Sequence, residues 1–114
     1  MTPLVLPGLG LGQLDGLVFE AFREGVTICH LQRSVQGAAA LALLRYAPGA
    51  AVPLHEHMGR ETILVLEGSQ SDEHGTYRPG TVVVNQTGSV HSVWSEEGCV
   101  VLISWEKPVR IIGE

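Results

Sequence analysis

The chain has 114 residues, of which 45% are hydrophobic and 17% charged, and its formal net charge is −5. This length supports one hydrophobic core and excludes two, and the apolar content excludes a disordered chain. The sequence has no basic cluster, so we expect no direct nucleic-acid binding. No apolar run reaches the roughly 18 residues of a transmembrane helix, so we expect no membrane insertion.

The N-terminal stretch "MTPLVLPGLGLGQLDG" has no positive residue before its apolar part and is interrupted by Pro3 and Pro7. It does not resemble a signal peptide, so we expect a cytoplasmic protein. An exposed apolar segment of this kind usually covers a partner. We therefore predict that residues 1–36 form N-terminal strands and a dimerisation segment, and that the protein is a homodimer.

The two cysteines, Cys29 and Cys99, do not form a C-x-x-C pair, which gives no support to a cysteine-rich zinc site or to thioredoxin-like chemistry. In a cytoplasmic protein both thiols are expected to be reduced. We interpret each as a small buried apolar side chain, with a long-range disulfide or a sensing thiol as the alternatives. For Cys99, the neighbouring Glu96 and Glu97 disfavour the thiolate and hence a sensing role.

Glycine and proline turn signals separate short runs of strand-like composition, which predicts an all-β sandwich or barrel. These runs span residues 62–68, 81–86, 89–94 and 99–105. The Ala-rich segment 37–49 has helical composition, but it lacks an N-cap and ends at a Pro-Gly turn. We predict a strand here as well.

The stretch "VPLHEHMGRETILVLEGS", residues 52–69, places three ionisable groups just before an apolar run. In a strand, His55 and His57 point to the same side. A turn with Gly59 at its flexible position would return the chain as a strand at Glu61. His91, in another strand-like run, offers a third imidazole. Three nitrogens and one carboxylate oxygen are a suitable ligand set for a divalent first-row metal.

Other candidate residues favour structural roles. His74 lies in a polar turn and is expected at the surface, and His30 is expected to pack within a strand. Trp94 should face away from the site because its offset from His91 is odd. Tyr46 and Trp105 could line a pocket mouth, although packing between sheets is the favoured interpretation.

The spacing of these residues resembles the two sequence motifs of the cupin family. The first motif, residues 49–68, has all its fixed positions filled: Gly49, His55, His57, Glu61 and Gly68. The second motif, residues 80–95, matches at Gly80, Gly88 and His91. Gln86 and Ser95 stand where the motif has proline and asparagine, which leaves the expected ligands intact. The resemblance implies an all-β, single small cupin domain over residues 1–114, an RmlC-like jelly-roll double-stranded β-barrel.

Residues 45–103 are similar in particular to the ChrR-type cupins, which include the C-terminal domain of ChrR anti-sigma factors and free-standing small cupins. Those anti-sigma factors also carry a helical N-terminal zinc domain. Residues 1–40 here contain one His, one Cys and no CxxC. We therefore do not expect this chain to act as an anti-sigma factor on its own.

The resemblance implies that His55, His57, Glu61 and His91 bind one divalent metal. Zn and Fe are the leading candidates, and Mn, Ni and Co suit the same ligands. Such a shell leaves open positions for a small-molecule ligand. The leading hypothesis is a small metal-binding cupin of ChrR type, an Fe(II) or Zn(II) enzyme that acts on a small organic molecule. With Fe(II), the expected reaction is dioxygenation, as in the acetylacetone-dioxygenase-like cupins that the chain resembles more distantly. The alternatives are a non-catalytic ligand or oxidant sensor, or a metal that only stabilises the barrel.

Overall fold

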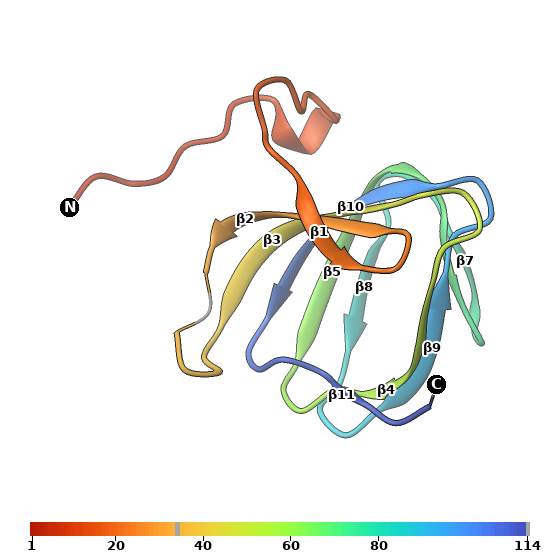
Figure 1. The fold of residues 1–114 in the computed structure, drawn as a ribbon. Helices are drawn as coiled ribbons and strands as arrows, with labels where there is room; N and C mark the ends of the chain where they lie inside the picture. The colour runs from red at the N-terminus through yellow and green to blue at the C-terminus, as the bar shows by residue number, and fades with distance from the viewer. Residues whose placement is uncertain (34, 114) are drawn as a thin grey trace.

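The computed structural model describes residues 1–33 and 35–113, and their regular secondary structure is all strand apart from one short 3-10 turn at Leu9–Leu11 (Figure 1). The strands are β1 (Glu20–Arg23), β2 (Val26–Gln32), β3 (Ala40–Tyr46), β4 (Ala51–Glu56), β5 (Glu61–Gly68), β6 (Gln70–Asp72), β7 (Gly75–Tyr77), β8 (Val82–Asn85), β9 (Val90–Trp94), β10 (Cys99–Trp105) and β11 (Arg110–Ile111). In this part of the chain no helix is long and apolar enough to cross a membrane.

The strands form two antiparallel sheets that face each other, as the predicted jelly roll requires (Figure 1). One sheet has six strands in the order β1-β2-β3-β10-β5-β8, and the other has five in the order β11-β4-β9-β6-β7. The main apolar cluster lies between them and draws on β2, β3, β4, β5, β9 and β10. The four runs expected to be strands correspond to β5, β8, β9 and β10, so that prediction is confirmed.

The Ala-rich segment is the strand β3, as predicted, although its composition favours helix. Ala42, Leu44 and Tyr46 alternate along it and pack into the core between the sheets. Leu43 points the other way and is nevertheless fully buried. A strand that is buried on both faces is stabilised by a continuous run of apolar side chains. This gain from tertiary packing outweighs the helical propensity of alanine.

The N-terminal segment covers the outer face of the six-stranded sheet. Leu6, Leu9, Leu14, Leu17 and Phe19 pack there against Cys29, Leu43 and Val100. The expectation that this apolar stretch needs a partner to cover it is therefore only partly right. Leu4, Val5, Leu11 and Val18 remain at least 61% exposed, and the predicted homodimer stays a prediction. Within residues 1–36, the predicted strands are β1 and β2.

Two positions in the first motif region, 59 and 68, require glycine for different structural reasons. Gly68 has a φ of 71°, and a Cβ at this position would lie 1.9 Å from the carbonyl oxygen of Gly98. Only glycine fits this close approach. Gly59 lies in the predicted bend after β4 but does not have a positive φ. A Cβ there would lie 2.9 Å from Cβ of Glu106. This position therefore requires glycine because of close packing, and not because of the flexible backbone that the sequence led us to expect.

Candidate metal centre

An irregularity in β4 directs the first histidine into the barrel. Val52 pairs with Val93 and His55 pairs with His91, so β4 has one residue more than β9 between these pairs. Val52 and His55 are both buried although they are three residues apart, which regular alternation forbids. Pro53 lies within this bulge, where its missing N–H breaks no ladder hydrogen bond.

His57 follows β4 and is held by its backbone. Its N–H donates to the Ser89 carbonyl oxygen at 2.9 Å, and its own carbonyl accepts from the Gly88 N–H at 2.8 Å. Gly88 belongs to the second motif, so the two motifs are joined directly at this point. The chain then bends and enters the six-stranded sheet as β5, with Glu61 as its first residue.

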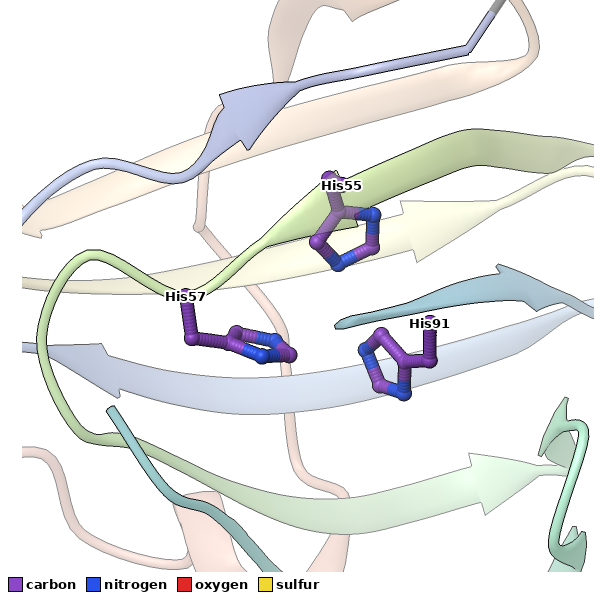
Figure 2. A group of neighbouring side chains, drawn as sticks. All are labelled: His55, His57 and His91. Carbon is purple, nitrogen blue, oxygen red and sulfur yellow. The ribbon is translucent and has the colours of Figure 1, made fainter. Parts of the chain in front are cut away.

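The three imidazole rings point toward one another inside the barrel (Figure 2). One ring nitrogen from each of His55, His57 and His91 lies within 4.8 Å of the other two. Ring centroids are 4.6–5.1 Å apart, with the rings edge to face. All three side chains are buried, with at most 5% of each residue exposed.

The Nδ1 atom of each ring faces a hydrogen-bond acceptor. His55 Nδ1 donates to the Pro53 carbonyl oxygen at 2.8 Å, and His91 Nδ1 donates to Asp72 Oδ2 at 3.1 Å. His57 Nδ1 lies 3.1 Å from the Ser89 carbonyl oxygen and 2.9 Å from Ser89 Oγ. That hydroxyl donates its own proton to the Gln86 carbonyl, so it accepts from His57. These contacts assign the proton of each neutral ring to Nδ1.

The opposite nitrogen, Nε2, then carries a lone pair on each ring. The Nε2 atoms of His57 and His91 are buried and have no hydrogen-bond partner among the described residues. Unpaired polar atoms in a protein interior are costly, so such a pair needs an explanation. Histidines that bind a metal almost always donate their other ring N–H to such an acceptor, so this arrangement is the one that metal ligation through Nε2 requires.

Glu61 lies beside the three rings but outside the compact histidine group. Its Oε1 is 3.5 Å from His57 Nε2 and accepts a hydrogen bond from Asn85 Nδ2 at 3.1 Å. A carboxylate and an imidazole lone pair at this distance repel each other unless a cation lies near them. Burial lowers the pKa of His57, but the nearby Glu61 carboxylate outweighs it, and the net shift is upward. This corner of the site therefore favours a positive charge.

The other two rings favour the neutral state that metal ligation requires. Burial lowers the pKa of His55 below the ordinary value, and the neighbouring His91 adds to this shift against the hydrogen bond to Pro53. Burial also lowers the pKa of His91, with His57 as the next cause. Both rings are thus neutral near pH 7 and can offer Nε2 to a metal.

Asp72 is a site residue that sequence reasoning did not single out. Besides His91, its carboxylate accepts from Tyr77 Oη and from the His74 N–H, both through Oδ1 at 2.8 Å. Burial acts against ionisation, but the hydrogen bonds from these three donors prevail and lower the pKa of Asp72. Asp72 lies within residues 45–103, the region similar to the ChrR-type cupins, yet nothing in the sequence connected it with His91.

A cavity of about 260 Å³ opens beside the histidines, between the two sheets. His55 and Glu61 form part of its wall, and most of the remainder is apolar, as at Val52, Ile63 and Val93. Tyr46 and Trp105 line it as well as packing against the core. The arrangement is a small, mostly apolar cavity whose wall includes two of the candidate ligands, His55 and Glu61.

The remaining candidates lie where the sequence suggested. His74 is exposed in the turn between β6 and β7. Trp94 faces away from the site, whereas Val93 is buried toward it. Both cysteines are buried and free, and burial raises the pKa of the Cys99 thiol to about 11. His30 is half-buried in β2, where its Nε2 lies 3.4 Å from a carboxylate oxygen of Glu20.

Comparison with known proteins shows the family of this chain. The family model described as the ChrR cupin-like domain matches residues 10–108. The chain belongs to the ChrR cupin-like domain family. It is 35% identical over 77 residues to the anti-sigma-E factor ChrR of Cereibacter sphaeroides. That match covers 65% of this chain and 36% of the relative, so the chain spans about a third of the ChrR protein.

Solved structures similar to this cupin domain have varied functions. The complex of SigE with the anti-sigma ChrR from Rhodobacter sphaeroides matches with a TM-score of 0.73 and 23% identity, over 93% of this chain and 70% of the other. An acetylacetone dioxygenase from Acinetobacter johnsonii matches with a TM-score of 0.76 and 17% identity, over 84% of this chain and 72% of the other. The polyketide cyclase RemF from Streptomyces resistomycificus matches with a TM-score of 0.76 and 20% identity, over 100% of this chain and 87% of the other. At these identities the likeness concerns the fold alone.

Proposed function

We propose that this protein is a metal-dependent cupin that binds one divalent cation and acts on a small organic molecule in the adjoining cavity. The observation that carries the proposal is the arrangement of His55, His57 and His91. Acceptors hold the Nδ1 proton of each ring, and the Nε2 atoms of two rings are buried without partners. Imidazoles that bind a metal through Nε2 need this tautomer and this fixed ring orientation.

Glu61 is proposed as the fourth ligand. Its carboxylate supplies the negative charge that three neutral imidazoles lack, and Asn85 orients it by donating to Oε1. Three nitrogens and one oxygen suit zinc and iron, and equally manganese, nickel and cobalt. Four protein ligands leave one or two positions open on a five- or six-coordinate ion.

The ion would supply Lewis-acid polarisation of a bound oxygen atom or, if it is iron, redox chemistry with dioxygen. The chain's own residues supply the rest. The aliphatic wall of the cavity holds the carbon skeleton of the substrate and excludes water, while Asp72, Ser89 and Asn85 fix the orientation of the ligands. Because no other acid–base pair lines the cavity among the described residues, we propose dioxygenase-like chemistry centred on the metal.

A second candidate function is a non-catalytic sensor of a small ligand or oxidant. It is favoured by the sequence match, which is to an anti-sigma factor. Since Cys99 is buried and its pKa is raised, it is a poor oxidant target, and sensing would have to act through the metal and the cavity.

The two candidates are separated by metal content and oxygen uptake. The protein is prepared without a metal-binding tag, its native metal is measured, and the Fe(II)-loaded form is given pentane-2,4-dione in an oxygen electrode. A catalytic role predicts oxygen uptake that matches loss of the diketone and disappears in His91→Ala. Zinc as the native metal, with no uptake by the iron form, would contradict the dioxygenase and favour the sensor.

A further inference from the structure

The cavity contains a cationic side chain that pairs with no carboxylate. Arg23, at the end of β1, lines the cavity. Among residues 1–33 and 35–113, no Asp or Glu oxygen lies within ion-pair distance of its guanidinium. By contrast, Arg33, Arg60 and Arg110 each lie within 3.5 Å of a glutamate oxygen. Arg45 and Arg78 also lack a carboxylate partner among these residues, but neither of them lines the cavity. The guanidinium of Arg23 lies 4.9 Å from the centre of the Phe22 ring, which leaves its charge without an anionic partner. In a chain with a net charge of −5, such an arginine in a cavity wall suggests that a ligand supplies the anion.

A second donor in the same wall also lacks an acceptor. Trp105 lines the cavity, and its Nε1 is buried with no hydrogen-bond partner in the described structure. A buried N–H without an acceptor is destabilising, which makes it rare in native proteins. The guanidinium and the indole N–H are both obligate donors, and a carboxylate oxygen satisfies either of them.

The rest of the cavity limits the size and polarity of the ligand. Leu44, Val52 and Ile103 contribute aliphatic surface. The volume, about 260 Å³, lies just below the roughly 300–1,000 Å³ of pockets that hold drug-sized ligands. The occupant is therefore a small molecule with an apolar body and one anionic group.

We propose that the cavity binds a small organic monocarboxylate, with its carboxylate on the guanidinium of Arg23 and its apolar body against the aliphatic wall. This assignment rests on the proposed function and extends it by naming the class of ligand. The cavity also reaches His55 and Glu61. We place the other end of the molecule toward these two residues.

The test compares hexanoate with hexanamide, which has the same shape and no charge, by shift titrations in two-dimensional amide NMR spectra. Both are titrated into wild type, Arg23→Gln and Arg78→Gln. Arg78 is an exposed arginine outside the cavity, so its variant removes the same charge elsewhere. Each titration is run on metal-free and on Zn(II)-loaded protein, and thermal melting confirms that the variants are folded.

We expect hexanoate to bind the wild type and Arg78→Gln about 5- to 30-fold more tightly than hexanamide, because Arg23 is only partly buried. In Arg23→Gln this preference should disappear. Equal binding of the two compounds to the wild type, binding of neither, or an unchanged preference in Arg23→Gln would overturn the inference. A preference that depends on zinc and not on Arg23 would place the carboxylate on the metal and leave the proposed metal site intact. Failure to bind zinc would refute the proposed function, and the Arg23-dependent preference could still be measured in the metal-free protein.

Discussion

Asp72→Asn should weaken metal binding although residue 72 is not a proposed ligand. The Asp72 carboxylate accepts three hydrogen bonds: through Oδ1 from Tyr77 Oη and the His74 N–H, and through Oδ2 from His91 Nδ1. An asparagine can accept the first two through its amide oxygen. Its NH₂ group then faces the Nδ1–H of His91, and two donors oppose each other in a buried position.

The conflict has two outcomes, and both affect His91 Nε2. If the ring keeps its tautomer, one buried donor is unsatisfied, which costs about 1–3 kcal/mol. If the proton moves from Nδ1 to Nε2, the amide contact is restored, but the metal-facing nitrogen no longer has a free lone pair. Loss of such a supporting carboxylate typically lowers metal affinity 10- to 100-fold, or about 1.4–2.7 kcal/mol.

The assay is Zn(II) affinity at pH 7.5, measured by competition with a chromogenic chelator. Nitrogen-15 NMR of the metal-free protein reports which nitrogen of His91 carries the proton. Asp15→Asn removes the same charge from an exposed carboxylate and should leave the zinc affinity unchanged. A zinc affinity of Asp72→Asn within twofold of the wild type, together with an unaltered His91 tautomer, would refute this reasoning.

Three further predictions test the fold and its surface. Gly68→Ala should lower the free energy of unfolding by about 2 kcal/mol or more, because the new Cβ would lie 1.9 Å from the Gly98 carbonyl oxygen. The control Gly80→Ala has open space around its Cβ and only backbone strain, so it should destabilise the protein less. Equal melting temperatures of the two variants would contradict this. Cys99 should be alkylated far more slowly in the native than in the unfolded protein. Because its folded pKa is raised to about 11, stability should be full below about pH 8.5 and fall between there and pH 11. Similar alkylation rates, or a peroxide-induced change of oligomeric state lost in Cys99→Ser, would instead support a sensing thiol. Light scattering should give a dimer of the 12.2 kDa chain, reduced to a monomer in Leu11→Lys, because exposed apolar residues remain in the N-terminal segment; a mass near 12 kDa at all concentrations would refute the dimer.

Much of the fold could be predicted because the turn signals and the strand-like runs agree with each other. The segment containing β3 shows how far local composition can mislead: its alanines favour helix, and only the all-β context indicated a strand. The docking of the N-terminal segment could not be predicted in the same way. The sequence shows that this segment is apolar, but its position over Cys29, Leu43 and Val100 depends on the assembled sheet.

The three histidines could be found because fixed spacing within two short motifs brings them together. What orients them depends on pairing between distant strands. The bulge at Pro53 breaks the alternation that the sequence implies for β4, and without it His55 would face outward from a strand that buries Val52. Asn85 reaches Glu61 only because β5 and β8 pair in that register. Asp72 and His91 are 19 residues apart and meet through the pairing of β6 with β9.

The central claim, that His55, His57, Glu61 and His91 bind one divalent metal, is tested most directly by metal stoichiometry. The wild type and His57→Ala are loaded with Zn(II), dialysed against metal-free buffer and analysed for zinc per chain, with His74→Ala as a control that removes an exposed imidazole. We predict one zinc per chain for the wild type and the control, and almost none for His57→Ala. Full zinc occupancy in His57→Ala, or no zinc retained by the wild type, would contradict the account.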